Sequence, residues 1–98
     1  MTKYESLYII STAKVADEAI PEKIEKYSQL ITDNQGTVES INTDSWGKRK
    51  LAYAINYETE GYYVLMTFEG NSELPRELER NFKNDEDILR FIVTKIGE

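Results

Sequence analysis

Residues 46–56 read Trp-Gly-Lys-Arg-Lys-Leu-Ala-Tyr-Ala-Ile-Asn, and we expect the rest of the fold to be arranged around this stretch. The cations at 48–50 are the one place where three basic residues stand together, and Trp46 and Tyr53 flank them. Such a group suits a polyanion, because cations displace counterions and aromatic faces stack on bases. Spacing alone favours a plainer interpretation, a half-buried strand with a solvated start, since a short charge run usually marks a wet surface. The choice therefore depends on the rest of the chain.

Length and composition restrict the possible classes of protein. With 98 residues, the chain should form one domain, 1–98, because a second core could not be buried in what remained. A content of 40% hydrophobic and 31% charged residues is that of an ordinary soluble globular protein. We expect a cytoplasmic protein, because no segment is long enough to span a membrane and the N-terminus has no apolar signal core.

The absence of both cysteine and histidine removes several kinds of site. A disulfide framework, a thiolate metal site, a zinc site and the usual general base are all excluded. The run Asn84–Asp87 lacks the glycine and the distal glutamate of a calcium loop, so it is predicted to be an exposed acidic turn. An enzyme would need paired carboxylates or an activated lysine in a pocket. We therefore expect no metal, no cofactor and no catalysis.

The formal net charge of −6 argues against a general nucleic-acid binder, which is normally basic throughout. Any RNA contact should then be local, with the acidic residues kept on the far side. A partner should supply further positive charge.

Alternating apolar residues predict four extended segments, Lys3–Ile10, 37–57, Tyr62–Phe68 and Ile88–Ile96. The second segment is interrupted near Asp44 and at Gly47, and a glycine inside a strand indicates a bulge or bend that re-aims the cations after it. The polar turn Glu58–Gly61 is short, so the second and third segments should pair as an antiparallel hairpin.

Two helices are predicted between these segments from apolar residues at helical spacing. Their stripes are Ile20, Ile24, Tyr27, Leu30 and Ile31 in the first helix, and Leu74, Leu78 and Phe82 in the second. Asp17 is expected to cap the first helix, with Pro21 in its first turn and Gly36 ending it in a left-handed conformation. Asn71 and Ser72 should open the second helix.

The order strand, helix, strand, strand, helix, strand predicts an α+β fold, the ferredoxin-like βαββαβ sandwich. Short crossovers and right-handed connections give one four-stranded antiparallel sheet in the order 4-1-3-2 with both helices on one face. The other face of the sheet is left open.

This architecture hosts many functions, so the fold does not decide between an RNA-binding or assembly component, a small enzyme, and a regulatory module that binds a small ligand. The loop 11–14 has no glycine that would let backbone amides converge on a phosphate or a ligand, which counts against the last two. The paired aromatic motifs of the RNA-recognition fold also match poorly, because the alternation puts Tyr8 and Tyr62 on the helix-covered face.

Several motifs follow one another along the chain: Tyr4–Glu5 with Tyr8–Ile10, Trp46–Ile55, Gly61–Val64 and Asp87–Phe91. With them, the chain resembles the small-subunit ribosomal protein six family of bacteria over Tyr4 to Lys95. Residues 47–55 match the signature of that family. The loop 11–14 departs from the family pattern, and Ser6 stands where an apolar residue is commoner, which should weaken the core slightly.

The resemblance implies the fold already predicted and a structural constituent of the bacterial small ribosomal subunit. It also implies binding to the central domain of small-subunit ribosomal RNA as a heterodimer with the eighteenth small-subunit protein. Neither a membrane nor a small-molecule substrate is implied. A ferredoxin-like regulatory or small-ligand-binding module without catalysis is the alternative.

Two surfaces are expected to carry this function. We predict an RNA site of Lys48, Arg49, Lys50, Trp46, Lys3 and Arg90, the last two extending it from neighbouring strands unless they are ordinary solvated cations. Arg49 is the residue best suited to a bidentate phosphate contact. The open sheet face is predicted to present Leu7, Ile9, Leu65 and Ile92, an apolar set that suits a docked protein partner.

Overall fold

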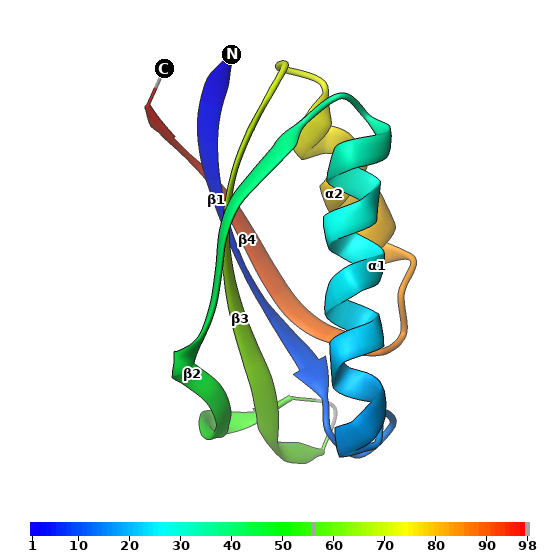
Figure 1. The fold of residues 1–98 in the computed structure, drawn as a ribbon. Coiled ribbons are helices and arrows are strands. Elements are labelled where there is room, and N and C mark those ends of the chain that lie inside the picture. Colours follow the sequence, from blue (N-terminus) through cyan, green and yellow to red (C-terminus); the bar gives the residue numbers. More distant parts are fainter. Residues whose placement is uncertain (56, 98) are drawn as a thin grey trace.

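Four strands and two helices follow one another along the chain in the predicted order. The computed structural model describes residues 1–55 and 57–97, without the side chains of 44–46 and 52. The elements are β1 Thr2–Ser11, α1 Ile20–Asp33, β2 Thr37–Ile55, β3 Glu58–Gly70, α2 Leu74–Lys83 and β4 Ile88–Gly97, with one 3-10 turn, Asp17–Ala19, before α1. The hairpin of β2 and β3 and the start of α1 lie at one end of the molecule, and both termini lie at the other (Figure 1).

The strands form one sheet in the order β2-β3-β1-β4, and every neighbouring pair is antiparallel. Read from the other edge this is β4-β1-β3-β2, the sequence of neighbours that was predicted. Both helices cover the same face of the sheet (Figure 1). The predicted α+β class, an antiparallel sheet with two helices, is confirmed.

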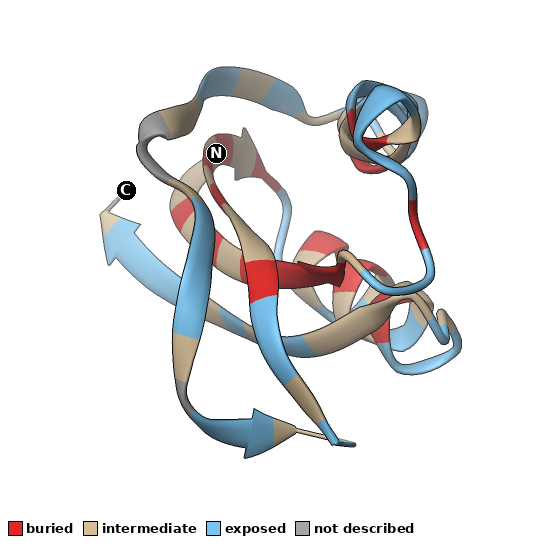
Figure 2. Cartoon of the chain, turned by 90° about the horizontal axis from the view of Figure 1, so that it is seen from below, coloured by how far each residue is buried: buried red, intermediate tan, exposed pale blue. Residues whose placement is uncertain are grey.

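The hydrophobic core lies between the sheet and the two helices. Both predicted helical stripes contribute to it, and their fully buried members include Tyr27, Ile31, Leu78 and Phe82. Tyr8 packs from β1 against two of them, with ring centroids 5.4 Å from Tyr27 and 4.9 Å from Phe82. Because Tyr8 is fully buried under the helices, it cannot stack on a base, as the alternation predicted. Figure 2 shows the buried residues gathered on these elements, while much of the hairpin end is exposed.

Ser6 is a polar residue inside this core. Its side chain is fully buried between those of its strand partners, Met66 of β3 and Val93 of β4, and no described residue gives its Oγ a hydrogen-bond partner. A buried hydroxyl without a partner loses its hydration without compensation. The predicted weakening of the core at this position therefore has a physical cause.

The ends of α1 differ from the predictions in two ways. Asp17 starts the 3-10 turn and does not cap α1, whose first residue is Ile20. Gln35, not Gly36, takes the left-handed conformation after α1, with φ of 63°. Gly36 is instead required by packing, because an added Cβ would lie 2.6 Å from Leu74 Cδ2. Since a glycine beside a helix end serves either purpose, the sequence alone could not separate them.

Asn71 opens α2 as predicted, although the helix itself starts three residues later at Leu74. The Asn71 Oδ1 accepts hydrogen bonds from the backbone N–H groups of Glu73 and Leu74, at 3.0 and 3.1 Å. Pro75 lies in the first turn, where a missing N–H costs least.

The third strand is longer than predicted. β3 begins at Glu58, so residues 58–61, which were expected to form the turn, are part of the strand. Ile55 pairs with Glu58, and Tyr57 has a left-handed φ of 68°. Polar side chains suggested a turn here because Thr59 and Glu60 are exposed within the strand.

Candidate nucleic-acid interface

The free end of the β2–β3 hairpin carries the cation run. Gly47 has a φ of 61°, and the register of β2 against β3 shifts between Asn42 and Gly47. This is the predicted bulge, and it is confirmed. The three cations follow it immediately and all are exposed.

The cations do not share one face of the hairpin. Lys48 pairs with Tyr62 and Lys50 with Glu60, which places both on the helix side of the sheet. Arg49 pairs with Gly61 and lies on the open side, with its Cζ 5.7 Å from the centroid of the Tyr63 ring. The hairpin therefore presents positive charge on both of its sides.

A second arginine and tyrosine join Arg49 and Tyr63 on the open side. Arg90 of β4 lies 5.8 Å from the centroid of the Tyr53 ring, and its Nη1 donates a hydrogen bond of 3.3 Å to the Tyr53 hydroxyl. The register places Ile9 between Arg90 and Tyr63, so the two pairs are neighbours on the sheet. We call Arg49, Tyr53, Tyr63 and Arg90 the arginine–tyrosine cluster. Guanidinium groups beside ring faces provide both phosphate contacts and stacking surfaces.

The cluster contains two of the predicted RNA-site residues and two tyrosines. Tyr53, 66% exposed, was expected only as an aromatic flank of the cations. The sequence analysis did not identify Tyr63 as a site residue, because its contact with Arg49 depends on the register of β2 against β3.

Acidic residues partly neutralise the cation run. The Nζ of Lys48 lies 3.5 Å from Glu60 Oε1, and both side chains are about half exposed. A pair in this environment contributes at most about 1 kcal/mol and is screened by salt. Lys48 thus remains available to a stronger anion.

Lys3 lies away from the other predicted RNA-site residues. It pairs with Glu69 on β3, whereas Arg49 pairs with Gly61, and eight residues of strand span about 26 Å. The Lys3 Nζ is 3.5 Å from Glu39 Oε1 instead. The expectation that Lys3 extends the patch is wrong, because β1 runs antiparallel to β3 and starts at the far end of the sheet. The side chain of Trp46 lies outside the described part of the structure.

The open face presents an apolar row across three strands. Leu7 is opposite both Leu65 and Ile92, so the three side chains lie side by side on the face without helices. Ile92 is 60% exposed. Ile9 lies one row nearer the hairpin end and is only 8% exposed, since it occupies the space over Gly61. Three of the four predicted partner-face residues therefore form the accessible row.

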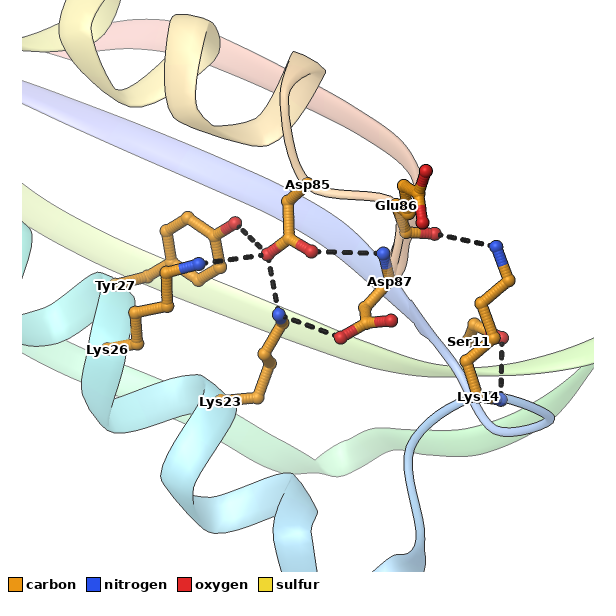
Figure 3. A network of polar contacts seen from close by, with 8 residues as sticks. All are labelled: Ser11, Lys14, Lys23, Lys26, Tyr27, Asp85, Glu86 and Asp87. Atoms are coloured by element: carbon orange, nitrogen blue, oxygen red, sulfur yellow. Dashed lines mark hydrogen bonds and ion pairs between the residues drawn. The ribbon is translucent and has the colours of Figure 1, made fainter.

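A buried ionic network links α1 to the turn before β4 (Figure 3). The Asp85 carboxylate, 7% exposed, lies 2.7 Å from Lys23 Nζ and accepts a 2.5 Å hydrogen bond from the Tyr27 hydroxyl. Lys23 also contacts Asp87 Oδ2 at 2.9 Å, and the backbone N–H of Asp87 donates to Asp85 Oδ1. The prediction of an exposed acidic turn is wrong at Asp85. The only sequence signal was the four-residue spacing of Lys23 and Tyr27, which places both on one side of α1.

The network shifts the acidity of its members. Burial alone would raise the pKa of Asp85, but hydrogen bonds from Lys23 and Tyr27 outweigh it and lower that pKa to about 2. Burial and the same hydrogen bond raise the pKa of Tyr27 above its ordinary range. Burial opposes the charge of Lys23, yet its bonds to Asp85 and Asp87 leave its pKa raised. The groups of the network bind one another, so we interpret it as a structural link between α1 and the turn before β4 and call it the Asp85 clasp.

Two further surveys concern the described residues only. No cluster of three potential metal-ligating acidic residues occurs among them. Neither of the described helices combines the length and the apolar character needed to cross a bilayer.

The chain is similar to ribosomal proteins over almost its whole length. The family model described as ribosomal protein S6 matches residues 3–95. The small ribosomal subunit protein bS6 of Clostridium novyi is 47% identical over 93 residues, which cover 95% of each chain. That of Thermoanaerobacter pseudethanolicus is 43% identical over 98 residues and the full length of both.

A solved structure has the same fold. The crystal structure of 30S ribosomal protein S6 from Thermotoga maritima superposes with a TM-score of 0.88 at 26% sequence identity, covering 97% of this chain and 87% of that one. The family match and the full-length relatives agree with this likeness. The chain belongs to the ribosomal protein S6 family.

Proposed function

We propose that the chain binds the central domain of small-subunit ribosomal RNA together with the eighteenth small-subunit protein, as a structural constituent of the bacterial small ribosomal subunit. Membership of a ribosomal protein family makes it a structural component, not an enzyme, and a cytoplasmic protein as part of the ribosome. The chain acts as one domain, which is supported by a single core to which both helices and the sheet contribute.

The arginine–tyrosine cluster is the observation that carries the RNA proposal. Arg49 and Arg90 each lie over a tyrosine ring on an exposed part of the open side. A guanidinium group can bind a phosphate through two hydrogen bonds, and an exposed ring such as that of Tyr53 offers a stacking surface. Lys48 and Lys50 add charge from the other side of the hairpin, and Trp46 belongs to the same site by its place in the sequence.

The apolar row supports the protein partner. Leu7, Leu65 and Ile92 form a contiguous apolar surface. A sheet face exposed to water normally has polar residues at such positions. A protein seated there would lie beside the arginine–tyrosine cluster. Because the chain carries a net charge of −6, a basic partner at this position would make the combined surface attractive to RNA.

The proposal is tested by the affinity of the heterodimer for a central-domain RNA fragment, measured against salt concentration with Arg49→Ala. We expect about tenfold weaker binding and a salt slope smaller by about 1, with an almost unchanged melting temperature. Arg76→Ala is the matched control, because Arg76 is an exposed arginine on α2, on the helix side. Equal affinities of Arg49→Ala and Arg76→Ala at every salt concentration would remove the cluster from the RNA site.

A further inference from the structure

A groove lies between the start of α1 and the bulged part of β2. It has a volume of about 530 Å³, within the range of pockets that bury a small ligand or a pair of side chains. Its apolar lining includes Ile20 and Ile24 of α1 and Tyr62 of β3. Figure 1 shows α1 beginning at the same end of the molecule as the hairpin. The register of the strands places the apolar row on the other face of the sheet.

Acidic side chains flank the apolar lining. Asp17 and Glu25 line the groove itself, and both are exposed. Lys48 is the one basic residue among the described residues of the lining, and its Nζ lies 3.5 Å from Glu60 Oε1. The groove therefore has negative charge around an apolar interior. Such a surface repels phosphate groups and attracts cations that also carry apolar parts.

We propose that this groove binds a basic protein segment that inserts an apolar side chain between α1 and β3, with flanking arginines or lysines beside Asp17 and Glu25. The site is separate from the apolar row, because it lies on the helix-covered side of the sheet. It gives the chain a second protein contact next to the proposed RNA site. Lys48 lies at the boundary between the groove and the proposed RNA site. A basic segment bound in the groove would therefore lie close to the RNA, and the positive charges of that segment would also attract the RNA.

The test uses the full chain and a fluorescent twelve-residue peptide of arginines with one central leucine, at physiological ionic strength. We expect saturable binding, with the largest amide shifts in NMR titrations at Ile20, Ile24 and Tyr62. A peptide with serine in place of leucine should bind about tenfold more weakly, because the interior of the groove is apolar. A twelve-nucleotide single-stranded RNA should leave the amides of Ile20 and Ile24, which lie on α1, unshifted.

Two variants and a matched control locate the site. Asp17→Lys with Glu25→Lys should weaken peptide binding by about tenfold, and Thr43→Trp, which fills the groove without a charge change, should do the same. Glu18→Lys with Glu22→Lys makes the same charge change in the 3-10 turn and the first turn of α1, outside the groove lining, and should change binding less than about twofold. Thermal melts verify that each variant is folded.

Three results would overturn the proposal. Equal losses in the two lysine double variants would indicate diffuse attraction to an acidic surface. Equal affinity of the leucine and serine peptides would remove the apolar insertion. RNA-induced shifts at Ile20 and Ile24 would make the groove a nucleic-acid site instead.

Discussion

Asp85 connects two segments that are almost sixty residues apart in the sequence. Its carboxylate receives Lys23 and Tyr27 from α1 while its own backbone belongs to the turn before β4. Removing one member of a buried ion pair leaves the other charge uncompensated. Loss of the Asp85 charge should therefore destabilise the fold. We therefore expect Asp85 to act on the stability of the fold.

The lowered pKa of Asp85, about 2 against an ordinary 3.8, predicts a specific pH dependence. A carboxyl group with a depressed pKa contributes stability that is present above its ordinary pKa and is lost as the pH falls toward 2. The difference corresponds to about 2 kcal/mol. Asp85→Asn should therefore lower the free energy of unfolding by about 2 kcal/mol at pH 7, and the gap to the unchanged protein should shrink toward pH 2.

Urea denaturation of both proteins across this pH range checks the prediction. Glu86→Gln is the control, because Glu86 is the adjacent exposed carboxylate and should change stability by less than about 0.5 kcal/mol. A constant gap between Asp85→Asn and the unchanged protein from pH 7 to pH 2 would rule out this linkage.

Two buried serines on β1 should respond to alanine in opposite directions. Ser11 donates a 2.6 Å hydrogen bond to Glu58 and accepts one from the backbone N–H of Lys14, whereas Ser6 has an unpartnered hydroxyl among the described residues. Ser6→Ala should raise the free energy of unfolding by about 1 kcal/mol, and Ser11→Ala should lower it by about 1 kcal/mol. Chemical denaturation of the pair measures both, and a destabilised Ser6→Ala would mean that its hydroxyl has a partner after all.

At the scale of the element, the bulged hairpin sets the direction of the cations. Gly47 occupies a left-handed conformation that costs other residues about 1–2 kcal/mol, and an added Cβ would lie 3.1 Å from the Thr43 carbonyl oxygen. The register shift at the bulge decides that Arg49 faces the open side, over Tyr63.

Gly47→Ala should lower the melting temperature and also weaken RNA binding by the heterodimer, because the strained bulge would relax and turn Arg49 away from Tyr63. Gly97→Ala is the control, since a Cβ at Gly97 would have no neighbour within 4 Å among the described atoms. Calorimetry and RNA titration together check this. A Gly47→Ala protein with an unchanged melting temperature and unchanged RNA affinity would show that the bulge does not set the direction of Arg49.

The elements themselves were predictable because their patterns are strong and local. The apolar stripe of α2 and the alternation of β3 place Leu78, Phe82 and Val64 in the core as expected. The bulge was predictable from one glycine inside a strand. The clasp at Asp85 and the arginine–tyrosine cluster were not, because each joins residues from distant segments whose meeting depends on helix phase and strand register.

At the scale of the whole molecule, the open face divides into an apolar part and a cationic part. The apolar row crosses β3, β1 and β4, and the arginine–tyrosine cluster lies one row nearer the hairpin end. The sequence predicted the apolar part from alternation alone. It misplaced Lys3 in the cationic part, because residue type does not tell which end of an antiparallel strand lies near the hairpin.

Ile92→Asp should abolish binding of the eighteenth small-subunit protein while leaving the fold intact, because this side chain is 60% exposed on the open face. Calorimetric titration with the purified partner measures the effect. Ser72→Asp adds the same charge in an exposed position before α2 and should leave partner binding unchanged. A partner that still binds Ile92→Asp tightly would have its docking surface elsewhere, such as the free edge of β4.

We propose that this acidic chain acquires RNA affinity by combining its arginine–tyrosine cluster with a basic partner on the neighbouring apolar row. The most direct test of this claim is the affinity for a central-domain RNA fragment of this chain alone, of the eighteenth small-subunit protein alone, and of the two together, at one physiological salt concentration. We predict that the pair binds about a hundredfold more tightly than either protein alone. Binding by this chain alone that is as tight as binding by the pair would contradict the claim.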